Sequence, residues 1–254
     1  MDSSELLKKK TNLLLDIAIA LMVSGANTNR ANTSINRFAL VLGCRAFSMI
    51  SHKTIVMTLT DNHTGETFTK VQNMPSYAIN FTTISCISKA SWKALGESWS
   101  IEKIESEFKK IRAEKKYSRI QVLLAVSLAG AGFCNIFGGD YTNMLVAMLS
   151  TFTGLFVLQE AHKRDFNMYF RVLLASFVAS SVASLGIVYD IGESPHIALA
   201  TSILFLVPGV PLINSFTDLL DNNLLNGQVR FTSGLMIVMA MAIGLFGALL
   251  IFQV

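Results

Sequence analysis

Charged residues are scarce in this sequence of 254 residues. Asp, Glu, Lys and Arg make up 15% of it, whereas 52% is hydrophobic, and the mean hydropathy is +0.49. An ordinary soluble domain carries about 25% charged residues, so this chain is too apolar to be one. We therefore expect membrane-spanning segments.

Cysteine and histidine are also few and widely spaced. Cys44, Cys86 and Cys134 lie near no histidine at metal-ligand spacing, which excludes a disulfide framework and a zinc site of the usual kind. His52 and His63 have no Ser, Cys or Asp at a spacing diagnostic of a catalytic triad. The sequence thus predicts no catalytic residue, no metal ligand and no cofactor.

The charges that are present divide the chain in two. Residues 1–119 hold 17 Lys and Arg against 10 Asp and Glu, a net charge of +7, whereas residues 120–254 hold 4 against 7, a net charge of −3. We expect a cytoplasmic α+β domain over residues 1–119 and a membrane domain over residues 120–254. The predicted fold class is an α-helical integral membrane protein with a small cytoplasmic domain in front of it.

Apolar periodicity predicts the elements of the first region. Asp16 interrupts the N-terminal apolar run, and Leu14, Ile17 and Leu21 recur at helical spacing, which favours an amphipathic helix over a signal peptide. The predicted order is a helical hairpin, a β-hairpin and two further helices. These are two helices that end before Ser24 and Gly43, strands over residues 47–60 and 67–71, and helices that begin at Pro75 and after Ser100.

The loop of residues 25–30 is the most unusual part of that region. Gly25 permits a turn, Thr28 or its neighbour Asn27 can cap the following helix, and Arg30 lies in the first helical turn. Helix N-termini bind anions, so one interpretation is an anion site formed by Gly25, Thr28 and Arg30. The other is an ordinary turn between helices with a solvated arginine.

A basic run precedes the first apolar segment, with seven Lys or Arg residues over residues 102–119. Nucleic-acid binding would explain it, but the positive-inside rule explains it better because a membrane span follows at once. The predicted partner of this run is membrane lipid rather than nucleic acid.

Five stretches without Asp, Glu, Lys or Arg are long enough to cross a bilayer, which takes roughly 17–25 residues. They cover residues 120–139, 141–159, 172–189, 194–217 and 231–254. With residues 1–119 inside, every Lys and Arg falls on the inner side, which predicts a cytoplasmic N-terminus and a periplasmic or extracellular C-terminus. Five spans cannot form two equal inverted repeats, so we expect a second membrane subunit or, failing that, a homo-oligomer.

The fourth predicted span is broken. Pro208, Gly209 and Pro211 interrupt it, and Asn214 and Asp218 follow at a spacing that places both on the face lining the break. An interrupted helix near mid-membrane indicates a transporter binding site. A simple proline kink is the alternative.

Three further ionisable residues lie at the ends of predicted spans. Arg230 and Arg171 are expected at inner ends, as topological anchors first and anion attractors second. Asp140 is expected at an outer end, either as a helix cap or as a carboxylate that carries a coupling proton or cation.

Several of these motifs together resemble the threonine/serine exporter (ThrE-type) family over nearly the whole chain. They are residues 24–30, residues 137–140, and residues 207–214 with Asp218 and Arg230 beyond them. The resemblance is to the split form of the family, in which a YjjP-like subunit works with a smaller YjjB-like subunit. It implies a cytoplasmic N-terminal domain and export of threonine and serine, or of succinate, linked to the proton motive force.

The leading hypothesis is therefore a subunit of a small-metabolite exporter in a bacterial inner membrane, not an enzyme. Its expected partners are a small-molecule substrate, membrane lipid and a YjjB-like subunit. The expected substrate or translocation residues are Pro208, Gly209, Pro211, Asn214, Asp218 and Arg230. The alternative is a membrane-tethered enzyme or a sensor that acts through the loop of residues 25–30.

Overall fold

The computed structural model describes residues 3–51, 53–114 and 117–254. The chain forms two compact units, one of residues 1–115 and 210–231 and the other of residues 116–209 and 232–254. Residues 210–231 therefore pack with the N-terminal unit, whereas the sequence places them in the membrane domain. His52 and two residues of the basic run, Lys115 and Lys116, lie outside the described residues.

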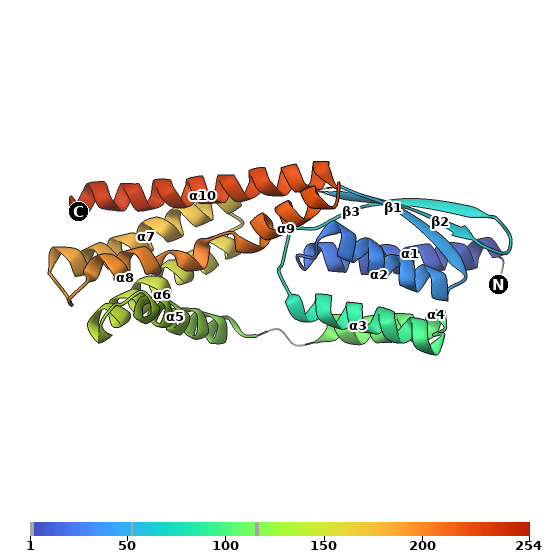
Figure 1. The fold of residues 1–254 in the computed structure, drawn as a ribbon, viewed down its shortest axis with the longest axis horizontal. Helices are drawn as coiled ribbons and strands as arrows, with labels where there is room; N and C mark the ends of the chain where they lie inside the picture. Colours follow the sequence, from blue (N-terminus) through green and yellow to red (C-terminus); the bar gives the residue numbers. More distant parts are fainter. Residues whose placement is uncertain (1–2, 52, 115–116) are drawn as a thin grey trace. The chain divides into compact units, whose positions relative to one another are not determined.

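The first unit consists of helices packed on a small sheet (Figure 1). Its elements are α1 (Ser3–Val23), α2 (Thr28–Val41), β1 (Cys44–Ile50), β2 (Thr54–Asp61), β3 (Thr67–Asn73), α3 (Phe81–Glu97) and α4 (Ile101–Ala113), followed by α9 (Gly209–Leu220) and the start of α10 (Leu224–Phe252). The predicted α+β composition is thus present in this unit.

The sheet has three antiparallel strands in the order β1-β2-β3, not the predicted hairpin of two. The stretch expected as one strand over residues 47–60 turns back on itself, because the backbone N–H of Ser51 donates to the carbonyl of Thr54 (2.9 Å). Ile50 then pairs with Ile55 in the β1–β2 register.

One face of β2 and one face of α1 form the core of this unit. Ile55, Met57 and Leu59 alternate along β2 and are fully buried, as period-two alternation predicts. Leu14 and Leu21 of α1 are also fully buried, which confirms the amphipathic helix. Each such side chain contributes about 1.5–3 kcal/mol to the free energy of unfolding.

The third helix begins later than predicted. The stretch from Pro75 to Asn80 is extended, and α3 starts at Phe81 with Asn80 as its N-cap. The extended stretch is held by backbone hydrogen bonds to the end of α1, from Ala78 to Val23 (2.9 Å) and from Asn80 to Ser24 (3.0 Å). These bonds take the N–H groups that a helix beginning at Pro75 would use. The Ser100 cap of α4 is confirmed.

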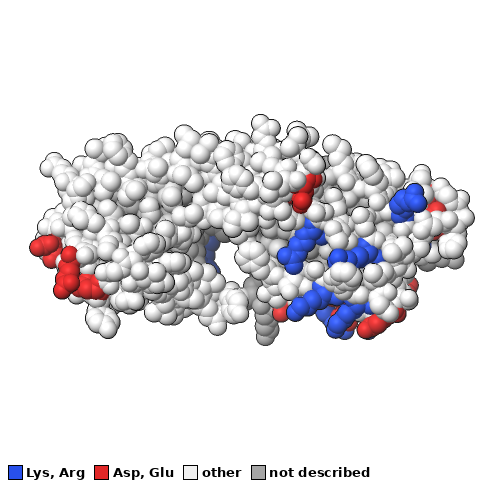
Figure 2. Space-filling model, viewed as in Figure 1, with Lys and Arg blue, Asp and Glu red and all other residues white. Residues whose placement is uncertain are grey.

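The second unit contains long apolar helices. They are α5 (Arg119–Ile136), α6 (Tyr141–Lys163), α7 (Met168–Val188), the short α8 (Pro195–Ser202), a 3-10 turn over Leu204–Leu206, and the remainder of α10. On the face shown in Figure 2, this unit carries few charged side chains, whereas Lys and Arg gather on the first unit.

Four of these helices are long and apolar enough to cross a membrane: α5, α6, α7 and α10. The fourth predicted span corresponds to the pair Pro195–Leu206 and Gly209–Leu220, which is broken at Val207 and Pro208. The described residues therefore offer four spans, or five if the bent pair crosses as one. The chain is a multi-pass membrane protein.

Small residues allow close helix packing in the second unit. A Cβ at Gly154 of α6 would lie 2.7 Å from Ala179 of α7, and one at Gly244 of α10 would lie 2.4 Å from the carbonyl oxygen of Leu173 on α7. Such approaches are typical of helix pairs in membranes, where packing rather than water drives association. Ser180 and Ser184 of α7 are buried, and their hydroxyls have no hydrogen-bond partner among the described residues.

Candidate functional site

A buried carboxylate lies at the centre of a polar cluster in the first unit. Asp218, on α9, is fully buried. Its Oδ1 accepts a hydrogen bond from the backbone N–H of Thr28 (2.9 Å), and its Oδ2 accepts one from the Thr28 hydroxyl (3.2 Å). These two contacts join residues 190 positions apart in the chain.

Arg230, on α10, provides the counter-charge. Its Nη1 lies 3.0 Å from Asp218 Oδ2, and its side chain is only 7% exposed. Nη1 makes this ion pair without an aligned hydrogen bond, whereas Nη2 donates to the carbonyl of Ala26 (2.9 Å). Because both charges are removed from water, each needs the other and the surrounding polar groups.

The loop of residues 25–30 is shaped to reach this pair. Gly25 has φ of +95°, a left-handed conformation that a side chain would strain. Its carbonyl accepts a hydrogen bond from Asn214 Nδ2 of α9 (2.7 Å). Asn27 then caps α2, accepting from the N–H of Arg30 (2.7 Å). The turn thereby leaves the N–H of Thr28 free to bind Asp218.

Asn226 completes the cluster and was not predicted. Its Nδ2 donates to Thr28 Oγ1 (3.0 Å) and to the carbonyl of Ile50 (2.8 Å). The signal that would have found it is its position four residues before Arg230, which places both on the same face of α10.

The occupant of the α2 N-terminus is therefore a carboxylate of the chain itself. An anion site is one of the two interpretations of this loop, and the anion found at the helix start is Asp218, whereas Arg30 is exposed as the ordinary-turn interpretation expects. The N-terminal end of the helix dipole and the Arg230 guanidinium both favour a negative charge at this point. The same donors would suit the carboxylate of a small solute if Asp218 withdrew or lost its charge. We call these residues, Thr28, Asn214, Asp218, Asn226 and Arg230, the carboxylate cluster.

The other residues singled out in the sequence lie outside the carboxylate cluster. Pro208 and Gly209 belong to the second unit, and Gly209 begins α9. Pro211 is in the first turn of α9, where a missing N–H leaves no helical bond unmade. The side chain of Arg30 is exposed and makes no hydrogen bond or ion pair with any described residue.

Asp140 and Arg171 belong to the second unit. Asp140 is the N-cap of α6 and accepts from the backbone N–H of Asn143 (3.0 Å). Desolvation raises the pKa of Asp140, but hydrogen bonds from Asn143 and Thr142 outweigh it and hold the pKa below its ordinary value. The structure thus shows the capping role. Arg171 contacts the imidazole of His162.

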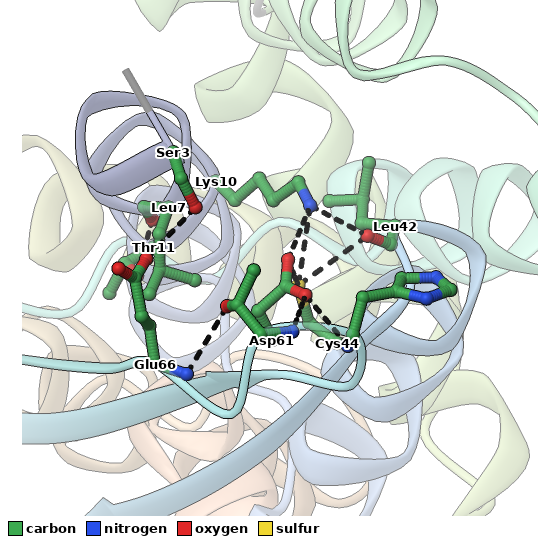
Figure 3. A network of polar contacts seen from close by, with 10 residues as sticks. Ser3, Leu7, Lys10, Thr11, Leu42, Cys44, Asp61 and Glu66 are labelled. Atoms are coloured by element: carbon green, nitrogen blue, oxygen red, sulfur yellow. Dashed lines mark hydrogen bonds and ion pairs between the residues drawn. The ribbon is translucent and has the colours of Figure 1, made fainter.

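A second polar network ties α1 to the sheet (Figure 3). Lys10 Nζ donates to the carbonyl of Leu42 (2.9 Å) and lies 3.4 Å from Asp61 Oδ2 and 3.5 Å from Cys44 Sγ. Hydrogen bonds from the backbone of His63 and Thr64 lower the pKa of Asp61. Burial raises the pKa of the Cys44 thiol, which keeps it protonated. Every contact in this network joins residues of the first unit, so the network stabilises that unit.

The described part of the chain contains no candidate metal site. No group of three or more His, Cys, Asp or Glu side chains there could hold a metal ion.

Comparison with known proteins bears on this arrangement. The model of the family described as "Putative threonine/serine exporter" matches residues 12–252. A protein of Klebsiella aerogenes, named "Probable succinate transporter subunit YjjP", is 26% identical over 241 residues, which cover 94% of this chain and 92% of that protein.

A protein of Escherichia coli K12 with the same name is 25% identical over 243 residues, which cover 95% of this chain and 94% of that protein. No solved structure shows a significant match to the chain.

Proposed function

Since this chain belongs to the putative threonine/serine exporter family, we propose that it is one subunit of an exporter of small carboxylates in a bacterial inner membrane. The chain is a membrane transporter rather than an enzyme. The substrate class proposed is a dicarboxylate such as succinate, because the similar proteins of two bacteria carry that substrate in their names.

The observation that carries the proposal is the carboxylate held by Arg230 and Thr28. In the described state that carboxylate is Asp218, with its two oxygens shared among a backbone N–H, a hydroxyl and a guanidinium. A substrate carboxylate offers the same two oxygens and the same charge. It would therefore compete with Asp218 for the same donors.

Competition of this kind gives a route to proton coupling. Protonation of Asp218 would cancel its charge and weaken its ion pair with Arg230, leaving the guanidinium ready for a substrate carboxylate. Deprotonation would restore the internal pair and expel the substrate. Alternating access requires two conformations that expose the site to opposite sides of the membrane, and the exchange of an internal carboxylate for an external one would shift the chain from one such conformation to the other.

The segments around the cluster link it to the membrane helices. Residues 210–231 belong to the first unit, yet α9 follows the break at Pro208, and α10 continues from Arg230 into an apolar helix that ends at Phe252. A change at Asp218 would act on both helices. We propose a cytoplasmic N-terminus, and a smaller YjjB-like membrane subunit as the partner that supplies the other half of the pathway.

The test is efflux of preloaded solute from cells that express this chain with and without a YjjB-like companion. We expect succinate release only with both chains. Because the proton and the dianion leave together in this scheme, release should be faster when the cytosol is more acidic than the medium, and the inside-negative membrane potential should assist it by driving the net negative charge outward. Threonine and serine are the comparison solutes, because they carry an ammonium group, with which the positively charged guanidinium of Arg230 makes no favourable contact.

Variants then tie the activity to the carboxylate cluster. Asp218→Asn and Arg230→Gln should each lower efflux at least tenfold, while Asp221→Asn, on an exposed residue three positions along, should leave it unchanged. Equal efflux from all three variants, with insertion verified, would remove the cluster from the mechanism. No release of any solute by the two chains together would refute the exporter of carboxylates.

A further inference from the structure

A polar groove lies between α2 and α3 of the first unit. Its volume is about 410 Å³, within the range of roughly 300–1,000 Å³ that small-molecule sites occupy. Its walls include Asn27, Arg30, Thr33 and Arg37 from the α2 side, and Ser88 and Trp92 from the α3 side. None of the cluster residues around Asp218 lines it.

The charge in this groove is of one sign. Arg30 and Arg37 are seven residues apart, two turns of the same helix, so they project from one face. No Asp or Glu is among the described residues that line it. Figure 2 shows Lys and Arg gathered on the side of the first unit that carries α2 and α3. An anion, and not a cation, is the ligand that this lining suits.

One of the two guanidiniums is held in place and the other is available. Arg37 lies over the ring of Trp92, with its Cζ 3.7 Å from the ring centroid, and Nη1 donates to Ser91 (3.4 Å). Stacking on an aromatic ring fixes the plane of the fork without using all its N–H donors. Arg30 is exposed and unpaired among the described residues.

We propose that the α2–α3 groove is a binding site for a small organic dianion of the dicarboxylate class. Two guanidinium forks match two carboxylates, and the hydroxyls and amides match the remaining oxygens. A zwitterion such as threonine would find no carboxylate for its ammonium group. The choice of a dicarboxylate rests on the proposed function, whereas the anion site rests on the groove alone.

The chain provides its own reporter for a test. Of its two tryptophans, Trp92 is in the groove and 58% exposed, whereas Trp99 is buried. In the Trp99→Phe variant of the full-length protein in detergent, Trp92 fluorescence is titrated with succinate, acetate, threonine and sodium sulfate at constant ionic strength. If the Trp99→Phe variant is unstable, calorimetric titration of the unmodified protein measures the binding constant instead.

We expect a saturable change with succinate, weaker binding of acetate, and none with threonine. Arg30→Gln should raise the dissociation constant about tenfold or more, since it removes one charged fork without touching the Trp92 stack. The matched control is Arg45→Gln, which removes the same charge from an exposed position on β1 and should leave the constant unchanged.

Two outcomes of the titration overturn the groove proposal. An equal response to sulfate would indicate a general electrostatic effect, and an Arg45→Gln effect equal to that of Arg30→Gln would place binding elsewhere. The absence of a saturable change with succinate would also overturn the groove proposal, but it would leave the efflux result intact. Conversely, binding that depends on Arg30 in a protein pair without succinate efflux would remove the proposed function and leave the groove.

Discussion

Replacing Asp218 with Asn should destabilise the first unit strongly, although the side chain keeps its shape. The amide retains an oxygen for the N–H of Thr28, but it removes the charge that faces Arg230 at 3.0 Å. Arg230 is only 6% exposed and would remain charged without a counter-ion. Removing one partner of a buried ion pair costs about 3–5 kcal/mol.

The expected change in melting temperature follows from that free energy. For a domain of this size, each kcal/mol shifts the midpoint by roughly 2–4 °C, so Asp218→Asn should melt about 6–20 °C below the unmodified protein. Trp92 and Trp99 are both in the first unit, so their fluorescence reports the unfolding of that unit without a signal from the second.

A double-mutant cycle separates the ion pair from packing. The double variant, Asp218→Asn with Arg230→Met, removes both charges. Its melting midpoint should lie well above the midpoint obtained by adding the two single shifts, because contacting residues couple by about 0.5–3 kcal/mol. The exposed Asp221→Asn is the control and should shift the midpoint by less than ~2 °C. A shift of Asp218→Asn as small as that control, or additive single shifts, would refute the reasoning.

Three further predictions concern packing and titration. Gly244→Ala places a methyl group against the α7 backbone and should lower the free energy of unfolding by about 1–3 kcal/mol. Gly247→Ala meets only the ring of Phe177, at 3.5 Å, and should be tolerated; thermal melting in detergent compares the two variants. The pKa of Asp61 is lowered in the folded state, so its stabilising contribution is present above the unfolded pKa and lost as pH falls through the folded pKa. Asp61→Asn should therefore flatten the loss of stability on acidification below about pH 4, and parallel curves would contradict this. Maleimide should label Cys86 faster than the buried Cys44 in the folded protein and both equally in denaturant, as mass spectrometry of the peptides would show.

Much of the fold follows from local patterns in the sequence. The helical spacing of Leu14, Ile17 and Leu21, the Ser100 cap and the long apolar segments each act over one or two turns, and each has its counterpart in the structure. The third strand was missed because the return at Ser51 carries no glycine or proline to mark it. The start of α3 was misplaced because Pro75 suggested a helix, while the end of α1 takes the N–H groups of Ala78 and Asn80.

The candidate site was only partly accessible to such patterns. The sequence predicts Thr28 as a cap, Asp218 as a residue that lines the break and Arg230 as an anchor at a helix end, and it lists Asp218 and Arg230 together only as expected translocation residues. Their meeting depends on how α9 folds back onto the α2 N-terminus, which no local spacing reports. Asn226 was missed for the same reason, since its donor groups acquire partners only when Thr28 and Ile50 are brought beside it.

The contact between Thr28 and Asp218 also sets the order in which this protein can be completed during its synthesis. Asp218 follows Thr28 by 190 positions, which take roughly 10–40 s to translate at 5–20 residues per second. During that interval the α2 N-terminus has no Asp218 to bind, and three long apolar helices, α5, α6 and α7, have already left the ribosome. The N-terminal unit can therefore close completely only after α5, α6 and α7 have been synthesised, so its closure is a late step in the making of this protein.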